Sequence, residues 1–284
     1  IHLVGRSFKY HRPRGFFGAG VEEPNAKLQV EFNGHSEPNV NATEMELVEG
    51  LSATSQNCWP SVNFDVGAIN NFLKMFFPAG FYYKTFMWPK SFWYKIYEPF
   101  IRKAAGLGVA SIEKDKERYE HKFEYCDLLV TGSGPSGLAS AYAAAKNGAK
   151  VILAEDKPRF GGTLLTDDVS IDNLSGKDWA EKIITELKSM PNVTVKNRSQ
   201  VFGYYDHNML VMFERVSDHL EKKSKFTPRQ RLWYIRAKET ILSTGSIERP
   251  IVFGNNDTPG IFLSAAAKEY MKVYGVLVLS LIHI

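Results

Sequence analysis

The chain has 284 residues, of which 44% are hydrophobic and 23% are charged, and its formal net charge is +4. This length suggests about two domains, and the composition is ordinary for a globular protein. The mild charge does not indicate nucleic acid or an anionic membrane as a partner, and no apolar run reaches the roughly 18 residues that a membrane helix needs.

The two cysteines, Cys58 and Cys126, lie far apart in the sequence. They form neither a disulfide framework nor a set of metal ligands, so we expect no metal site and a reducing, cytoplasmic location. The chain opens at Ile1 without a methionine or a signal peptide, and it ends on a short apolar run. We interpret it as a fragment, with residues 277–284 as a doubtful, non-native tail.

The first 48 residues predict a small β-rich unit. Lys27–Gly34 alternates apolar and polar side chains and ends on an Asn-Gly pair. This pattern is typical of a strand that runs into a hairpin turn. Asn41–Gly50 predicts a further strand.

Residues 49–122 have a different composition. Between Asn71 and Phe100, 13 of 30 side chains are aromatic, and three prolines interrupt the stretch. The prolines exclude one continuous helix. The stretch is either a linker packed on neighbouring domains or an exposed apolar surface that meets another protein chain, because so large a patch is unfavourable on a monomer. Arg118–Tyr125 is rich in charge and is interpreted as a connector.

Residues 123–276 predict an α/β domain, because strands and helices alternate along this stretch and such an order implies a parallel sheet. The helices are expected at Pro135–Asn147 and Asp178–Met190. Strands are expected at 125–132, 149–156 and 239–245, and at the start of 192–206, which ends in a turn.

A glycine-rich loop joins the first of these strands to the first helix, with the spacing G-x-G-x-x-G. Gly132 permits a tight turn, Gly134 lets a pyrophosphate approach the backbone, and Gly137 lets the helix pack closely on the strand. The N-terminus of the helix then offers free N–H groups to the phosphates. The strand and helix on either side make this a dinucleotide-binding motif of the Rossmann-like, glutathione-reductase-like class.

Three features beyond the loop agree with this interpretation. Glu155 ends the next strand, where a carboxylate accepts hydrogen bonds from the ribose hydroxyls and repels a 2′-phosphate, which disfavours NADP. The pair Gly161-Gly162 follows it, and the strand that ends at Thr244 and Gly245 returns the chain to the cofactor. The spacing leaves both NAD and FAD open.

Several longer stretches resemble one family, the α subunits of heterotetrameric sarcosine oxidases. The most specific are the basic segment "VGRSFKYHRPRG" and the aromatic segment "PAGFYYKTFMWP". The others are "EEPNA", "SQNCWPS", "YEPFIRKAAGLG", "CDLLVTGSGPSGLA", "PRQRLWYIRAK" and "STGSIERPIVFGNNDTPGI". Together they extend to about Val276, so the resemblance is to the N-terminal part of such an α chain.

The resemblance implies a ferredoxin-like β domain without a cluster, followed by a dinucleotide domain that binds NAD. It also implies a partner β subunit that carries FAD and the amine-oxidising site, smaller subunits that complete a heterotetramer, and an FMN between α and β. Sarcosine is then oxidised to glycine with release of H2O2, and the one-carbon unit passes to tetrahydrofolate. The family's folate domain is absent from this chain.

The resemblance also assigns residues to the cofactor. It places the glycine loop around the NAD pyrophosphate, Glu155 on the adenosine ribose, and Thr244 and Gly245 over the site. The full predicted cofactor-binding set is Gly132, Ser133, Gly134, Pro135, Ser136, Gly137, Glu155, Asp156, Arg159, Gly162, Thr163, Val201, Thr244 and Gly245.

No residue of the chain is predicted to be a catalyst, because nicotinamide and flavin carry their own redox chemistry. The chain is therefore expected to belong to an oxidoreductase complex that acts on CH–NH donors and to be inactive alone. One alternative is a self-sufficient FAD-dependent pyridine-nucleotide-type oxidoreductase. Others are the α-type subunit of an opine oxidase, hydrogen cyanide synthase or N-methylglutamate dehydrogenase, or an assembly module whose dinucleotide is structural.

Overall fold

The computed structural model describes residues 27–32, 34–42, 45–56, 58–61, 64–76, 80, 86–249, 251–254, 256 and 261–278. The basic segment near the start of the chain, most of the "PAGFYYKTFMWP" segment and most of the tail lie outside these residues. The chain folds as two compact units. Unit 1 comprises residues 1–113, 248–271 and 276–284, and unit 2 comprises residues 114–247 and 272–275. The predicted boundaries at 48, 122 and 276 stay predictions.

Unit 1 contains a three-stranded antiparallel sheet in the order β2-β1-β3. Its strands are β1 (Lys27–Phe32), β2 (His35–Asn41) and β3 (Ser52–Ser55). The predicted hairpin is present, since Gly34 lies between β1 and β2 with a φ of 79°. The strand predicted at 41–50 is wrong among the described residues, because the third strand begins only at Ser52 and pairs with β1.

The helices of unit 1 are short. They are η1 (Val66–Asn71), η2 (Leu73–Phe76), η3 (Lys90–Phe92), η4 (Trp93–Tyr97), α2 (Glu98–Ala104) and α5 (Ser264–Lys272, whose last residue belongs to unit 2). Pro89 precedes η3, and Pro99 lies in the first turn of α2, where a missing N–H costs no hydrogen bond. No helix of the described residues is long and apolar enough to cross a membrane.

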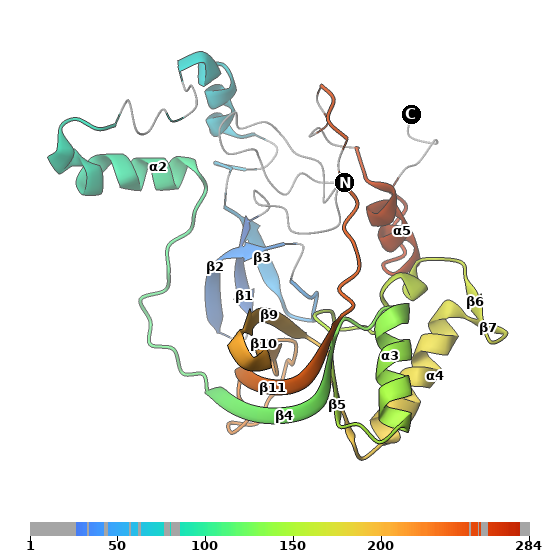
Figure 1. The fold of residues 1–284 in the computed structure, drawn as a ribbon. Coiled ribbons are helices and arrows are strands. Elements are labelled where there is room, and N and C mark those ends of the chain that lie inside the picture. The colour runs from blue at the N-terminus through green and yellow to red at the C-terminus, as the bar shows by residue number, and fades with distance from the viewer. Residues whose placement is uncertain are drawn as a thin grey trace. The chain divides into compact units, whose positions relative to one another are not determined.

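Unit 2 is built on a six-stranded sheet in the order β8-β5-β4-β11-β10-β9 (Figure 1). The first four strands in this order are parallel, and β10 and β9 are antiparallel to their neighbours. The strands are β4 (Tyr119–Thr131), β5 (Val151–Ala154), β8 (Val193–Lys196), β9 (Ser199–Tyr205), β10 (Met209–Arg215) and β11 (Gln230–Leu242).

The helices α3 (Pro135–Lys146) and α4 (Gly176–Ser189) lie side by side on one face of the parallel strands (Figure 1). The remaining elements are η5 (Gly162–Leu165), the hairpin β6 (Ser170–Ile171) and β7 (Leu174–Ser175), and η6 (Asp206–Asn208). The predicted α/β class with a small β-rich unit beside it is confirmed. Both predicted helices are present within two residues of their expected ends.

The core of unit 2 lies on both faces of β4 and β5. Leu128 and Val130 face the helices and pack with Leu138 of α3, whereas Leu129 and Ile152 face the other way. On that second face they meet apolar side chains of the antiparallel strands, namely Leu210, Met212, Ile235 and Ala237. β5 and the second half of β4 are therefore buried on both faces, as their near-continuous apolar sequence predicts.

Two sequence interpretations in unit 2 change. The connector predicted at Arg118–Tyr125 is wrong, because Tyr119 to Tyr125 form the first half of β4 and pair with Gln230–Arg236 of β11. The stretch 192–206 holds two strands, β8 and β9, rather than one. Pairing with β11, which is distant in sequence, makes 119–125 a strand, and a local sequence pattern carries no information about such a partner, whereas β9 forms a hairpin with β10, the next strand along the chain.

Candidate dinucleotide-binding site

The glycine loop lies at the carboxyl end of β4, where the chain turns into α3. The N–H of Gly132 donates to the carbonyl of Ala154 at 2.8 Å, which ties the turn to the end of β5. Gly134 is the N-cap of α3 and Pro135 occupies its first turn. Because Gly134 has no side chain with which to cap the helix, the first-turn N–H groups of Ser136 and Gly137 stay available to an anion.

The three glycines of the loop are needed for three different physical reasons. A Cβ atom at Gly137 would lie 1.9 Å from the carbonyl oxygen of Gly132, so only glycine lets the helix approach the strand. A Cβ at Gly132 would lie 2.2 Å from the carbonyl oxygen of Ser243, and the φ of Gly132 is +97°. A Cβ at Gly134 would meet nothing within 4 Å. Gly137 and Gly132 therefore serve the fold, and Gly134 borders open space.

Glu155 lies beside this loop, and its side chain is only 7% exposed. Its Oε2 accepts the backbone N–H of Ser133 at 2.9 Å and the hydroxyl of the same serine, and its Oε1 accepts the N–H of Lys157 at 3.0 Å. These hydrogen bonds fix the position of the Glu155 carboxylate beside the glycine loop. The structure thus brings the predicted ribose acid to the predicted phosphate loop.

Burial raises the pKa of Glu155, and a hydrogen bond with the side chain of Asp156 raises it further. The hydrogen bonds from Ser133 and from the N–H of Lys157 act in the opposite direction but do not cancel the rise. Because desolvation disfavours the charged carboxylate, hydroxyl donors from a bound ribose would stabilise its ionised form.

Ser133 makes more contacts than the motif alone predicts. It is fully buried, and the N–H of Gly161 donates both to its hydroxyl at 3.2 Å and to its carbonyl at 3.1 Å. This serine joins the glycine loop, Glu155 and the Gly161-Gly162 turn. A Cβ at Gly162 would lie 3.0 Å from the Cα of Gly134, so the turn packs closely on the backbone of the loop.

The remaining predicted residues lie after β11, after β5 and on β9. Thr244 and Gly245 follow β11, and they lie beside the glycine loop because the N–H of Ser243 donates to the carbonyl of Thr131 at 2.7 Å. Asp156, Arg159 and Thr163 are exposed on the loop after β5. The guanidinium of Arg159 donates to the carbonyl of Val273 at 3.2 Å.

Val201 lies on the edge strand β9, and its side chain packs on the core between the two parts of the sheet. The predicted contact of Val201 with an adenine through its backbone stays a prediction. The link to Glu155 is short, because the N–H of Ser199 donates to the carbonyl of Glu155 at 2.7 Å. The roles of all the predicted cofactor-binding residues stay predictions.

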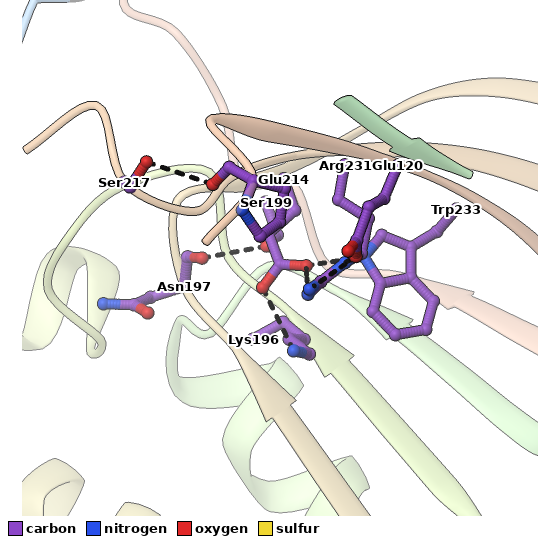
Figure 2. A network of polar contacts seen from close by, with 9 residues as sticks. Glu120, Lys196, Asn197, Ser199, Glu214, Ser217, Arg231 and Trp233 are labelled. Atoms are coloured by element: carbon purple, nitrogen blue, oxygen red, sulfur yellow. Dashed lines mark hydrogen bonds and ion pairs between the residues drawn. The ribbon is translucent and has the colours of Figure 1, made fainter. Parts of the chain in front are cut away.

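The sequence analysis did not predict a largely buried ionic network that joins side chains of β8, β10, β11 and β4 (Figure 2). Glu214 of β10 accepts from Lys196 of β8 at 3.0 Å, from Arg231 at 2.9 Å and from the indole of Trp233 at 2.6 Å. Arg231 also contacts Glu120 of β4 at 3.0 Å. Three strands separate β8 from β10 in the sheet, so these contacts show that the sheet bends back over itself.

Burial acts to raise the pKa of Glu214, but the hydrogen bond from Trp233 and the cations of Lys196 and Arg231 outweigh it. The pKa is therefore below its ordinary value, and Glu214 is a carboxylate at neutral pH. The one sequence signal for this network is a glutamate in the apolar run of β10 opposite an arginine of β11, and that signal appears only once their register is known.

Comparison with known proteins agrees with both units. A family model described as a 2Fe-2S iron-sulfur cluster binding domain matches residues 1–58, and one described as FAD dependent oxidoreductase matches residues 127–213. The α subunit of sarcosine oxidase from Rhizobium meliloti (strain 1021) is 52% identical over 96% of this chain. This chain covers 28% of that relative's length.

Two further relatives are more distant. An opine oxidase subunit from Agrobacterium tumefaciens (strain Ach5) is 26% identical over 54% of this chain and 30% of its own length. The crystal structure of L-proline dehydrogenase from P. horikoshii matches 98% of this chain and 42% of its own chain, with a TM-score of 0.60 at 18% identity. The latter likeness supports the fold and nothing more.

The cysteines of this chain do not fit a [2Fe–2S] cluster. Such a cluster is held by four ligands, usually cysteine thiolates, whereas this chain has Cys58 and Cys126 alone. Cys126 is fully buried in β4 of unit 2, and burial raises its pKa to about 12, so it stays a thiol. The first unit is thus ferredoxin-like in its family match but lacks the donor set for the cluster.

Proposed function

We propose that this chain, a homologue of the sarcosine oxidase α subunits, is the dinucleotide-binding part of such an α chain. The observation that carries the proposal is the cradle at the carboxyl end of β4. There the open space beside Gly134, the N-terminus of α3 without a side-chain cap and the carboxylate of Glu155 lie together. A diphosphate needs the first two and an adenosine ribose needs the third.

NAD is the proposed occupant, and FAD is the second candidate. Glu155 suits the adenosine ribose of either and repels the 2′-phosphate of NADP. The match of residues 127–213 to FAD-dependent oxidoreductases favours FAD. When bound, either dinucleotide supplies its own redox chemistry. The residues of this chain bind and orient it: the loop and α3 hold the phosphates, and Ser133 holds Glu155 in place.

The proposed reaction of the whole complex is the oxidative demethylation of sarcosine to glycine. Oxygen is reduced to H2O2, and the one-carbon unit passes to tetrahydrofolate. Amine oxidation belongs to a flavin-bearing β subunit with FAD, an FMN lies between the two subunits, and smaller subunits complete the heterotetramer. This chain is then inactive alone and cytoplasmic. The 26% identity to an opine oxidase subunit favours, as the second candidate, an α-type chain that serves another amine.

The test is to purify the chain, denature it and identify the released dinucleotide by absorbance and chromatography. Release of NAD without flavin supports the proposal as stated. Release of FAD contradicts NAD as the occupant and supports FAD, the second candidate for the bound dinucleotide. A folded chain that releases neither, and that binds neither in titration calorimetry, overturns the dinucleotide assignment. Sarcosine oxidation by the chain alone would contradict the placement of the amine chemistry on a partner.

A further inference from the structure

In the first half of β4, charged side chains face the inside of the bent sheet and aromatic side chains face outward. The register with β11 and β10 places Glu120 in one row with Arg231 and Glu214, so its carboxylate faces the inside of the bent sheet (Figure 2). Side chains alternate along a strand, so the residues next to Glu120 face outward. These outward residues of β4 are Tyr119, His121, Phe123 and Tyr125.

The same rows extend this outward face across three strands. Phe123 lies beside Tyr234 and Val211, and His121 lies beside Leu232 and Phe213. The third row joins Tyr125, Arg236 and Met209. We call this set of side chains the outer face. The opposite side carries the charged groups of Glu120 and Arg231 at this end of the sheet, and it becomes part of the core only farther along β10 and β11.

The aromatic side chains that β4 contributes to the outer face are exposed, whereas Tyr234 and Phe213 are half-buried and Val211 is buried. Phe123 is 78% exposed, Tyr119 is 49% exposed and Tyr125 is 45% exposed. The ring of Tyr234 stacks on the rings of Phe123 and His121. The ring centroids are 5.0 Å and 5.9 Å apart, and the interplanar angles are 14° and 18°. Such stacking orders the aromatic rings, and a contiguous exposed apolar patch ordinarily marks an interaction site.

The chemistry of the outer face favours a protein partner. Exposed tyrosine, phenylalanine and arginine are the residues enriched in protein interfaces, whereas small-molecule sites are concave. The guanidinium of Arg236 is exposed and donates to the carbonyl of His207 at 2.8 Å. Among the described residues no carboxylate pairs with it, whereas the neighbouring Lys238 is paired with Asp127 at 2.8 Å.

We propose that the outer face is the surface through which this chain docks onto another subunit of its oxidase, one that offers an apolar patch with a carboxylate opposite Arg236. This rests on the proposed function only in taking the partner to be a subunit of the oxidase. The interface buries Phe123 and Tyr234 at its centre, and Arg236 supplies a charged contact at its rim. The docking surface is separate from the glycine loop, which lies beyond the other end of β4.

Hydroxyl-radical footprinting tests the proposal on the unaltered protein. The chain is labelled alone and after co-expression and purification with the other subunits of the oxidase. We expect labelling of Tyr119, Phe123 and Tyr125 to fall several-fold on assembly. Phe226, which is 74% exposed in the loop between β10 and β11, is the internal control and keeps its labelling. Equal labelling of Phe123 in the two samples overturns the proposal.

A matched pair of variants tests it independently. Phe123→Asp is expected to weaken assembly by about tenfold or more, because a charge then replaces a central aromatic contact. Phe226→Asp introduces the same charge at similar exposure and is expected to assemble normally. Arg236→Glu is expected to weaken assembly, and Arg236→Lys to restore most of it. Normal assembly of Phe123→Asp, judged by size-exclusion chromatography with light scattering, contradicts the proposal.

The other possible occupants give different results. If a second copy covers the face, the chain alone is a dimer that Phe123→Asp dissociates, and assembly with the other subunits is unaffected. That outcome overturns the proposal. The dinucleotide content is measured on the same samples. Loss of labelling at Phe123 in a complex that holds no dinucleotide refutes the proposed function but supports the docking surface. A complex that holds dinucleotide but labels Phe123 as in the chain alone supports the proposed function and refutes the docking surface.

Discussion

The two halves of β4 differ strongly in how far their side chains are buried. The second half, from Cys126 to Val130, is almost entirely buried, with helices on one face and the antiparallel strands on the other. The first half, from Tyr119 to Tyr125, has a polar network on its inner side and exposed aromatic rings on its outer side. The glycine loop thus follows the buried end of β4, and exposed aromatic side chains lie at its other end.

The difference follows both the composition and the neighbours of each half. The first half alternates charged and aromatic residues, the second half is mostly apolar, and both pair with β11 along its length. Only the second half also pairs with β5 and receives α3 above it. Substitutions in the second half should therefore affect folding or dinucleotide binding, and those in the first half should affect assembly. The following predictions test this division, from the largest effect to the smallest.

Gly137→Ala should cause the largest loss. The new Cβ would lie 1.9 Å from the carbonyl oxygen of Gly132, and both groups are backbone, so the helix must move away from the strand. We expect a loss of about 3 kcal/mol or more in the free energy of unfolding, measured by chemical denaturation.

Gly134→Ala is its matched control, because a Cβ there meets nothing within 4 Å. We expect stability within about 1 kcal/mol of the unaltered chain but weaker dinucleotide binding, because the methyl group occupies the space of the diphosphate. If the two variants lose stability equally, the division of roles among the glycines is wrong.

Leu129→Ala should cost about 2–5 kcal/mol, because this side chain is fully buried between the parallel strands and the antiparallel strands. Phe123→Ala, six residues earlier on the same strand, should change the free energy of unfolding by about 0.5 kcal/mol or less. Thermal unfolding of the two variants side by side measures the contrast. A large loss from Phe123→Ala would mean that the outer face is already packed in the isolated chain.

Glu214→Gln should cost about 3 kcal/mol at neutral pH, because it removes the carboxylate that pairs with the largely buried Lys196 and leaves Arg231 paired with Glu120 alone. The pKa of Glu214 is lowered in the folded state, so its contribution is present above the ordinary value of 4.5 and disappears as the pH falls through the folded value. Denaturation of both proteins across acid pH should show the gap closing. A gap that does not depend on pH would contradict this account.

Ser133→Ala should cost about 1–3 kcal/mol, because it removes a buried hydroxyl that donates to Glu155 and accepts from Gly161. Glu155 then loses one hydrogen bond that favours its ionised form, so its pKa should rise further. Dinucleotide affinity should consequently weaken on acidification at a higher pH than in the unaltered chain, as titration calorimetry at several pH values would show. Identical pH profiles would mean that Ser133 acts on the fold alone.

The site was largely predictable because its determinants are local. Gly132, Gly134 and Gly137 report their roles through spacing, and Glu155 is identified by its position at the end of the following strand. The link from Ser133 to Glu155 was not predictable, since a serine at a variable position of the motif carries no signal of its own. Only the folded loop shows that its hydroxyl is buried against the acid.

The wrong connector and the missed ionic network both concern partners that are distant in sequence. In Tyr119–Tyr125 the charged residues alternate with aromatic ones, a pattern that suits either an exposed connector or a strand. Its pairing with Gln230–Arg236, more than 100 positions away, makes it a strand. The Glu214 network likewise depends on the bend of the sheet, which brings β8 against β10.

The sequence by itself determined the glycine loop, the helix that follows it, the ribose acid and the resemblance to one family, because each depends on residue types at short spacing. Only the tertiary structure decided which side of β4 faces the core, which carboxylates are paired and which aromatic rings stay exposed. These depend on strand register and on what packs against each face, and such contacts join residues that the linear sequence keeps far apart.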